Sequence, residues 1–244
     1  MRMVRLVVLL GLLAAPAAAQ STSELVRVAE PAGLGRLVRS DGPPDAPLVV
    51  MLPDALGDDG RSEPYVDSLL ARGIASLVLG LDEDLEGAPS PSDPAASAEA
   101  LAGAVAWALG RGIPASRIGV MGFGLGGRVA LAAGGWLPAA ALYPRCAGLK
   151  VAAGHAVILQ GKEDAAGCAD LALPAATEFQ AIAAGHGWDV PGAIWPSPGP
   201  VLPDPAGGPR LQAREDLTAT LQAAEFLAEW FETALGGHIH RAGR

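Results

Sequence analysis

The run from Gly122 to Gly127 (GFGLGG) is the part of this sequence whose residue types and spacing indicate chemistry most directly. Its glycines at 122, 124 and 127 match G-x-G-x-x-G, a pattern in which backbone N–H groups bind the phosphates of a dinucleotide. The same residues match a nucleophile elbow, G-x-nucleophile-x-G, with Gly124 at the position of the attacking residue. The run therefore predicts either a nucleotide-binding turn or a hydrolase-type turn without an attacking atom.

Strands and helices alternate along the chain and must position this run. Short apolar runs predict buried strands at residues 48–52, 74–79, 118–121, 139–143 and 156–160, with a short last strand within 189–195. The spacing of apolar residues predicts helices at 66–73, 99–109, 128–133, 177–184 and 216–235. Loops are predicted at 86–96 and 196–209, which are rich in proline. This alternation predicts an α/β fold with a mostly parallel central sheet and helices on both faces.

The N-terminus has the pattern of a secretory signal peptide. Arg2 and Arg5 precede an apolar run, and Ala17 and Ala19 are the small residues before a cleavage site after Ala19. The apolar run is shorter than the roughly 20 residues that a membrane-spanning helix needs. We therefore expect a signal peptide at 1–19, a single domain at 20–244, and export to the periplasm or the extracellular space without stable membrane insertion after cleavage.

Composition restricts the partners and cofactors. The formal net charge of −9 disfavours binding to nucleic acid or to anionic lipid. Cys146 and Cys168 form an even pair, which in an exported protein favours a disulfide, although a reactive thiol or half of a metal site would also need a cysteine. Neither cysteine has a histidine at metal-ligand spacing, so we expect no metal.

The position of the glycine run favours the elbow over the nucleotide turn. A dinucleotide fingerprint normally lies in the first strand–helix turn of its domain, with an acidic residue about 20 positions later. Here the run follows earlier strands and helices, and the next strand ends in Tyr143-Pro144-Arg145-Cys146 without an acid. Arg145 is the one alternative contact for a 2′-phosphate, and an exported protein meets little dinucleotide. We therefore expect no cofactor.

A family resemblance supports the elbow. The stretch 120–128 (VMGFGLGGR) resembles the elbow of the dienelactone hydrolases, a family of the α/β-hydrolase superfamily, and differs only at the nucleophile. Tyr143-Pro144 resembles the segment that closes that family's next strand, and 161–164 (GKED) resembles its G-x-x-D segment. The resemblance covers nearly all of the mature chain. It implies the α/β-hydrolase fold, Asp164 as the triad acid, and a disulfide between Cys146 and Cys168 as in exported members.

The resemblance also assigns the residues around the elbow. It implies an oxyanion hole built from the backbone N–H groups of Ala55 and Leu125. Asp54 falls where some members place a glutamate beside the nucleophile, and here we expect a solvated loop acid or a helix cap. An alternative for Asp164 is a turn aspartate that bonds nearby backbone N–H groups.

The histidine position is the second departure from the family. Residues 191–195 (PGAIW) resemble the segment that carries the catalytic histidine, which places Trp195 at that position. An indole ring donates one hydrogen bond and accepts no proton. The four histidines of the chain lie elsewhere, and we expect none of them within reach of the nucleophile position; they are His155, His186, His238 and His240.

These substitutions predict a non-catalytic homologue, a pseudoenzyme that binds a small acyl or lactone-like ligand, or a protein partner. Gly124 enlarges the expected pocket and Trp195 gives it an aromatic wall, which suits an apolar ligand. One alternative is an active ester or lactone hydrolase with a relocated nucleophile, for which Ser116 and Ser197 are the candidates. The other alternative is a nicotinamide oxidoreductase.

Overall fold

The structure, a computed structural model, describes residues 21–28, 33–80, 92–133, 135–145, 147–151, 155–164, 177–192, 201–202 and 211–236. Several positions singled out in the sequence lie outside these residues: the predicted signal peptide, Cys146, Cys168, Trp195, Ser197, His238 and His240.

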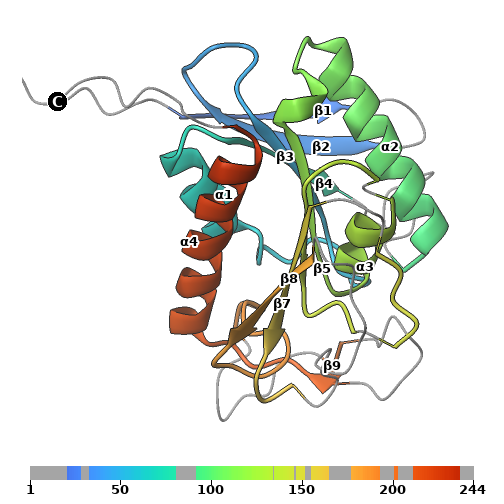
Figure 1. Cartoon of the computed structure of the whole chain (residues 1–244), viewed down its shortest axis with the longest axis vertical. Coiled ribbons are helices and arrows are strands. Elements are labelled where there is room, and N and C mark those ends of the chain that lie inside the picture. Colours follow the sequence, from blue (N-terminus) through green and yellow to red (C-terminus); the bar gives the residue numbers. More distant parts are fainter. Residues whose placement is uncertain are drawn as a thin grey trace, which may run out of the picture.

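A twisted central sheet organises the described residues (Figure 1). Its eight strands have the order β1-β2-β4-β3-β5-β6-β7-β8. Their bounds are β1 (Ser21–Arg27), β2 (Leu34–Ser40), β3 (Leu48–Leu52), β4 (Ala75–Gly80), β5 (Ile118–Phe123), β6 (Ala139–Leu142), β7 (Ala156–Gly161) and β8 (Thr177–Ile182). The strands from β4 to β8 in this order pair in parallel, whereas β2 is antiparallel to both β1 and β4. The predicted α/β class with a mostly parallel sheet is confirmed.

Helices cover both faces of the sheet. Figure 1 shows α1 (Glu63–Ala71) and α4 (Leu217–Ala234) on one face, and α2 (Pro94–Gly110) and α3 (Gly124–Ala133) on the other. The remaining elements are a 3₁₀ turn, η1 (Ala115–Arg117), and a small ribbon of β9 (Val201–Leu202) and β10 (Leu211–Gln212). Among the described residues, no helix has both the length and the apolar character needed to cross a bilayer.

Strand β3 shows why the central strands are uniformly apolar. Successive side chains of a strand point to opposite faces of the sheet. Leu48, Val50 and Leu52 pack in the core under α2 and α3, whereas Val49 and Met51 pack in the core under α1 and α4. A strand buried on both faces needs apolar residues at every position, which explains why these strands were recognisable in the sequence.

Two helices begin at aspartate caps. The carboxylate of Asp216 accepts the N–H of Ala219 at 2.9 Å at the start of α4, as the prediction of a helix over 216–235 requires. The carboxylate of Asp93 accepts the N–H of Ala95 at 2.8 Å, and Pro94 occupies the first turn of α2. The helix predicted at 99–109 therefore begins earlier, inside the stretch predicted as a loop.

The helix predicted at 177–184 is wrong. Residues 177–182, predicted within a helix, form β8, which pairs in parallel with β7 from Ala156 opposite Thr177 to Gly161 opposite Ile182. Three of these residues, Thr177, Phe179 and Ile182, are types that favour strands. Because β8 is an edge strand and partly exposed, it lacks the alternation of apolar and polar residues that would have identified it as a strand. In the segment 189–195, predicted to contain a short last strand, residues 189–192 form no strand, and 193–195 lie outside the described residues. The segment that follows β8 is consequently brought beside the end of β7.

The connection between β5 and α3 is closed by glycines. Strand β5 ends at Phe123 and α3 begins at Gly124, whose φ is +48°. A Cβ on Gly122 would lie 2.3 Å from the carbonyl carbon of Gly126, and a Cβ on Gly126 would lie 2.2 Å from the carbonyl oxygen of Pro53. The glycines therefore let the turn pack against the end of β3.

We predict that Gly126→Ala destabilises the fold by about 3 kcal/mol or more, because the backbone at Pro53 must move to accept the methyl group. Urea unfolding measures this change. The control is Gly110→Ala at the end of α2, where a Cβ meets nothing within 4 Å. Its effect should lie between neutral and a gain of about 1 kcal/mol, since alanine favours helix more than glycine does. Equal losses in the two variants would contradict the close packing of the elbow.

Candidate functional site

The carboxyl ends of the parallel strands bring five residues from distant parts of the chain to one edge of the sheet. Asp54 follows β3, Gly124 follows β5, Tyr143 follows β6, Asp164 follows β7 and His186 follows β8. Ligands of open parallel sheets bind at this edge. This edge is therefore the candidate site.

The carboxylate of Asp54 fills the space beside Gly124. A Cβ on Gly124 would lie 2.5 Å from Oδ1 and 2.8 Å from Oδ2 of Asp54, distances too short for real contacts. Asp54 is only 1% exposed, so the expectation of a solvated loop acid or a helix cap is wrong. An attacking side chain at position 124 and the carboxylate of Asp54 cannot both occupy this volume.

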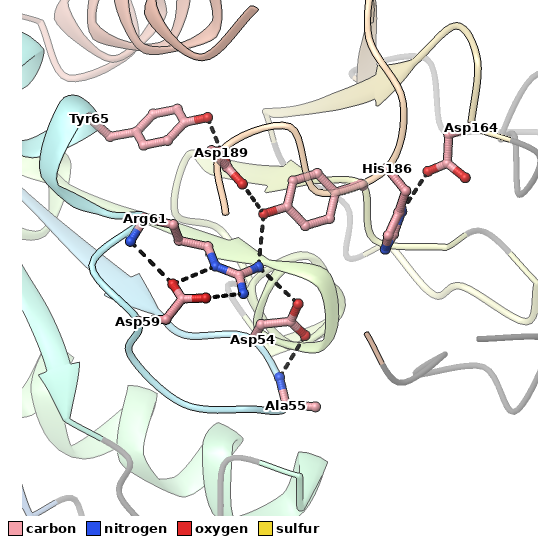
Figure 2. Close-up of polar contacts among 9 residues, drawn as sticks. Asp54, Ala55, Asp59, Arg61, Tyr65, Asp164, His186 and Asp189 are labelled. Carbon is pink, nitrogen blue, oxygen red and sulfur yellow. Dashed lines mark hydrogen bonds and ion pairs between the residues drawn. The ribbon is translucent and has the colours of Figure 1, made fainter. Parts of the chain in front are cut away.

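Arg61 balances the charge of Asp54. Its Nη1 donates to Oδ2 of Asp54 at 3.0 Å, and both side chains are 2% exposed. The guanidinium also binds the carboxylate of Asp59, through Nε at 2.8 Å and Nη2 at 2.5 Å (Figure 2). Burying a carboxylate is unfavourable unless it is paired and hydrogen-bonded. Arg61 thus provides the counter-charge that stabilises the buried carboxylate of Asp54 at the elbow.

One of the two predicted oxyanion donors is already occupied. The N–H of Ala55 donates to Oδ1 of Asp54 at 2.6 Å (Figure 2). The N–H of Leu125, the other predicted donor, lies in the first turn of α3. A bound ester carbonyl would compete with the carboxylate of Asp54 for the Ala55 N–H.

Buried tyrosines extend the network from Arg61 to Asp189. Nη1 of Arg61 also donates to Oη of Tyr143 at 3.1 Å, and Oη of Tyr143 donates to Oδ1 of Asp189 at 2.5 Å. Oη of Tyr65 donates to the other oxygen of Asp189 at 2.8 Å. Burial raises the pKa of both tyrosines well above the usual range, and the nearby carboxylate of Asp189 adds to this effect. The phenols therefore stay protonated and act as donors.

The residues after β6 are held in unusual backbone conformations. Tyr143 has a φ of 40° and Arg145 a φ of 56°, in the left-handed region that non-glycine residues rarely adopt. Arg128 of α3 fixes this segment, because its guanidinium donates to the carbonyl oxygens of Arg145 and, at 3.1 Å, of Ala147. Such strain persists only where surrounding contacts enforce it, and it concentrates at functional sites.

Asp164 and His186 form a buried acid–histidine pair. Nδ1 of His186 lies 2.7 Å from Oδ2 of Asp164. The amide of Gln160 donates to the same oxygen, and Nη1 of Arg145 lies 3.9 Å from the other. Since an ionised carboxylate only accepts hydrogen bonds, Nδ1 carries the proton and Nε2 keeps its lone pair in the neutral ring. Figure 2 shows His186 with this second nitrogen directed away from Asp164.

The pairing of His186 with Asp164 was not predicted, because the resemblance gave Asp164 as the triad acid but Trp195 as the residue at the histidine position. The helix predicted at 177–184 put His186 at a helix end, whereas β8 carries it to Asp164. Asp164 contacts the side chains of His186 and Gln160, which the alternative of a turn aspartate did not include. A strand-like segment followed by the glycine-flanked histidine at 185–187 (GHG) was the signal that the sequence offered. Trp195, the predicted occupant of the histidine position, lies outside the described residues.

Other predicted candidates lie away from the pair. His155 is exposed, and its Nε2 lies 3.0 Å from Oε1 of Glu178 on the surface. Ser116 is exposed in η1, before β5. The ring of His186 instead packs against Tyr143, with the ring centroids 5.0 Å apart, which joins the acid–histidine pair to the Arg61 network. The site thus combines an acid, a base and an elbow, but position 124 carries no attacking atom.

A cavity lies next to the elbow. It has a volume of about 340 Å³ and is lined by apolar side chains of α2 and α3 that include Ala98, Leu125 and Val129. Arg128 and Lys150 contribute the positive charges of its wall. Leu125 links this cavity to the predicted oxyanion donor.

We predict that Arg61→Met lowers the free energy of unfolding by about 3–5 kcal/mol, because it leaves Asp54 buried without its counter-charge. Urea unfolding measures the loss. The control is Arg36→Met, which removes an ion pair to Glu63 whose side chains are 27% and 52% exposed. That variant should lose no more than about 1 kcal/mol. If Arg61→Met were as stable as the control, Asp54 would not depend on Arg61.

Comparison with known proteins identifies the fold. The sequence matches no protein-family model and no curated protein sequence. A putative dienelactone hydrolase from Klebsiella pneumoniae subsp. pneumoniae MGH 78578 superposes with a TM-score of 0.62 at 17% identity, over 87% of this chain and 98% of that chain. The dienelactone hydrolase-like promiscuous phosphotriesterase P91 from metagenomic libraries gives 0.60 at 17% identity, over 89% and 99%. Carboxyl esterase 2 of the mycorrhizal fungus Tuber melanosporum gives 0.58 at 12% identity, over 90% and 88%. The chain therefore has the fold of the dienelactone hydrolases, an α/β-hydrolase fold.

Proposed function

We propose that this chain is an exported, non-catalytic relative of the dienelactone hydrolases that binds a small acyl or lactone-like ligand. The observation that carries the proposal is the position of Asp54, whose carboxylate lies 2.5 Å from where a Cβ of residue 124 would be. The signal-peptide pattern at residues 1–19 supports export.

Ester hydrolysis through an elbow requires two things that Asp54 obstructs. An attacking atom must reach the carbonyl carbon, and backbone donors must bind the oxyanion that develops. The carboxylate of Asp54 fills the volume that an attacking side chain at position 124 would need. It also accepts the N–H of Ala55, which would otherwise be a donor to the oxyanion. Its negative charge would also repel a developing oxyanion, since like charges repel strongly where water is excluded.

The cavity beside Leu125 supports the proposal that the protein binds a small ligand. Its volume of about 340 Å³ lies at the lower end of the range of roughly 300–1,000 Å³ typical of small-molecule sites. Apolar walls suit a short acyl chain, and Lys150 suits a carboxylate or a polarised carbonyl. The other form of this proposal is that the same edge of the sheet binds a protein partner.

A second function, ester hydrolysis by a water molecule, is favoured by one observation. The hydrogen bond between Asp164 and Nδ1 of His186 leaves Nε2 of the ring as a base. Nicotinamide chemistry has no such support, because the carboxylate of Asp54 lies against the glycine run where a phosphate would have to bind.

We predict that wild-type protein hydrolyses p-nitrophenyl butyrate no faster than buffer, and that Gly124→Ser does not change this, because Asp54 fills the volume of the new side chain. The double variant Gly124→Ser/Asp54→Ala should gain turnover, since the serine then has room at the same edge of the sheet as His186. Asp59 remains to balance Arg61 in that variant. Rates of p-nitrophenol release measure all three proteins.

His186→Ala in the double variant is the control and should abolish the gained turnover. Turnover by the wild type that His186→Ala removes would replace the binding proposal with the water-based hydrolase. An inert double variant that is correctly folded would show that Asp54 is not what blocks the elbow.

We predict that hexanoate and δ-valerolactone raise the thermal midpoint of the wild type, because ligands that bind only the native state stabilise it. Ala98→Phe should abolish the shift, because the ring fills the cavity beside Leu125. The matched control is Ala102→Phe, on the exposed side of the same helix. Equal shifts in the two variants would show that these ligands bind elsewhere.

A further inference from the structure

A second cavity lies at the opposite edge of the sheet from Gly124. Its volume is about 310 Å³. It is formed where β2 ends, β3 and β4 begin, and α2 ends, so that Ser40, Leu48, Ala75 and Trp107 all line it. None of the residues around the elbow contributes to it.

The floor of this cavity is apolar and its wall is aromatic. Leu37, Leu48, Ala75 and Ile113 are all buried residues of the floor. Trp107 of α2 is half-buried against the same core and presents an indole ring. A small apolar body fits this part of the cavity, since these side chains carry no polar groups.

The rim carries two arginines whose charge is not neutralised by an ion pair in the described part of the chain. Arg39 and Arg111 line the cavity, and neither forms an ion pair there. The guanidinium carbon of Arg111 lies 4.4 Å from the centroid of the Trp107 ring. Stacking of this kind holds the plane of the guanidinium and leaves its N–H edges available for a carboxylate.

Several other arginines do form ion pairs. Arg36, Arg72 and Arg117 each form an ion pair with a carboxylate, at the surface or partly buried. In a protein with a net charge of −9, this cavity brings together two guanidinium groups that form no ion pair with the described residues. They create a positive potential at the mouth of an apolar space.

We propose that this cavity binds a small organic monoanion, a carboxylate on an aromatic or branched apolar body. Arg39 and Arg111 bind the carboxylate, and the body lies on the floor against Trp107. Glu24, whose side chain also lines the rim, repels additional negative charge and so selects against phosphates and other polyanions. This site is independent of the function proposed for the elbow.

Isothermal titration of the full chain with sodium benzoate tests the proposal, with benzamide as a neutral molecule of the same shape. Benzoate should bind, and benzamide should bind about tenfold more weakly or worse, since a charge-assisted hydrogen bond contributes more than a neutral one. Arg39→Gln/Arg111→Gln should weaken benzoate binding about tenfold or more. Glu24→Gln should strengthen it, because it removes the one opposing charge.

Two controls separate this site from general electrostatics and from the elbow. Arg27→Gln removes the same charge at the far end of β1 and should leave the affinity for benzoate unchanged, as should His186→Ala. Arg39 and Arg111 are exposed, so thermal unfolding without ligand should match the wild type. The proposal is overturned if the wild type does not bind benzoate, if benzamide binds equally well, or if Arg39→Gln/Arg111→Gln binds like the wild type.

Discussion

The buried ion pair between Asp54 and Arg61 is the contact on which the rest of the site depends. It allows a carboxylate to lie at the end of β3 with almost no exposure, where an unpaired carboxylate would be strongly unfavourable. From Arg61 the hydrogen bonds continue through Tyr143 to Asp189, and the ring of Tyr143 packs against His186. One charge pair therefore connects the elbow with the acid–histidine pair across the edge of the sheet.

The position of the Asp54 carboxylate depends on the absence of a side chain at Gly124. A side chain at position 124 would exclude the carboxylate, and the carboxylate excludes such a side chain. Glycine also adopts the φ of +48° at the turn without the strain of roughly 1–3 kcal/mol that another residue would bear there. The elbow is thus packed around a buried, paired carboxylate.

The sequence predicted the parts of the fold that local patterns encode. The strands that became β3, β5, β6 and β7 were recognisable because burial on both faces makes every position apolar, and the glycine spacing located the elbow. Strand β8 was missed because an edge strand is partly exposed and its six residues also fit a helix. The contact of His186 with Asp164 was missed for the same reason, since it is β8 that places this histidine beside Asp164.

The polar network could not have been predicted from spacing. Tyr65 and Asp189 are 124 positions apart in the chain, and Arg61 and Tyr143 are 82 apart. Which charges meet is decided by the order of strands in the sheet, and the sequence pattern predicted only that the sheet was mostly parallel. The same limit explains why Asp54 was expected to be solvated.

Intact-protein mass spectrometry after acid quench of a reaction with p-nitrophenyl butyrate, and separately with a fluorophosphonate, tests the non-catalytic elbow most directly. Covalent hydrolysis through an elbow leaves an acyl or phosphonyl group on the attacking residue. An elbow filled by Asp54 predicts an unchanged mass for the wild-type protein with both reagents. An adduct that peptide mapping assigns to Asp54, or to any serine at this edge of the sheet, would contradict it.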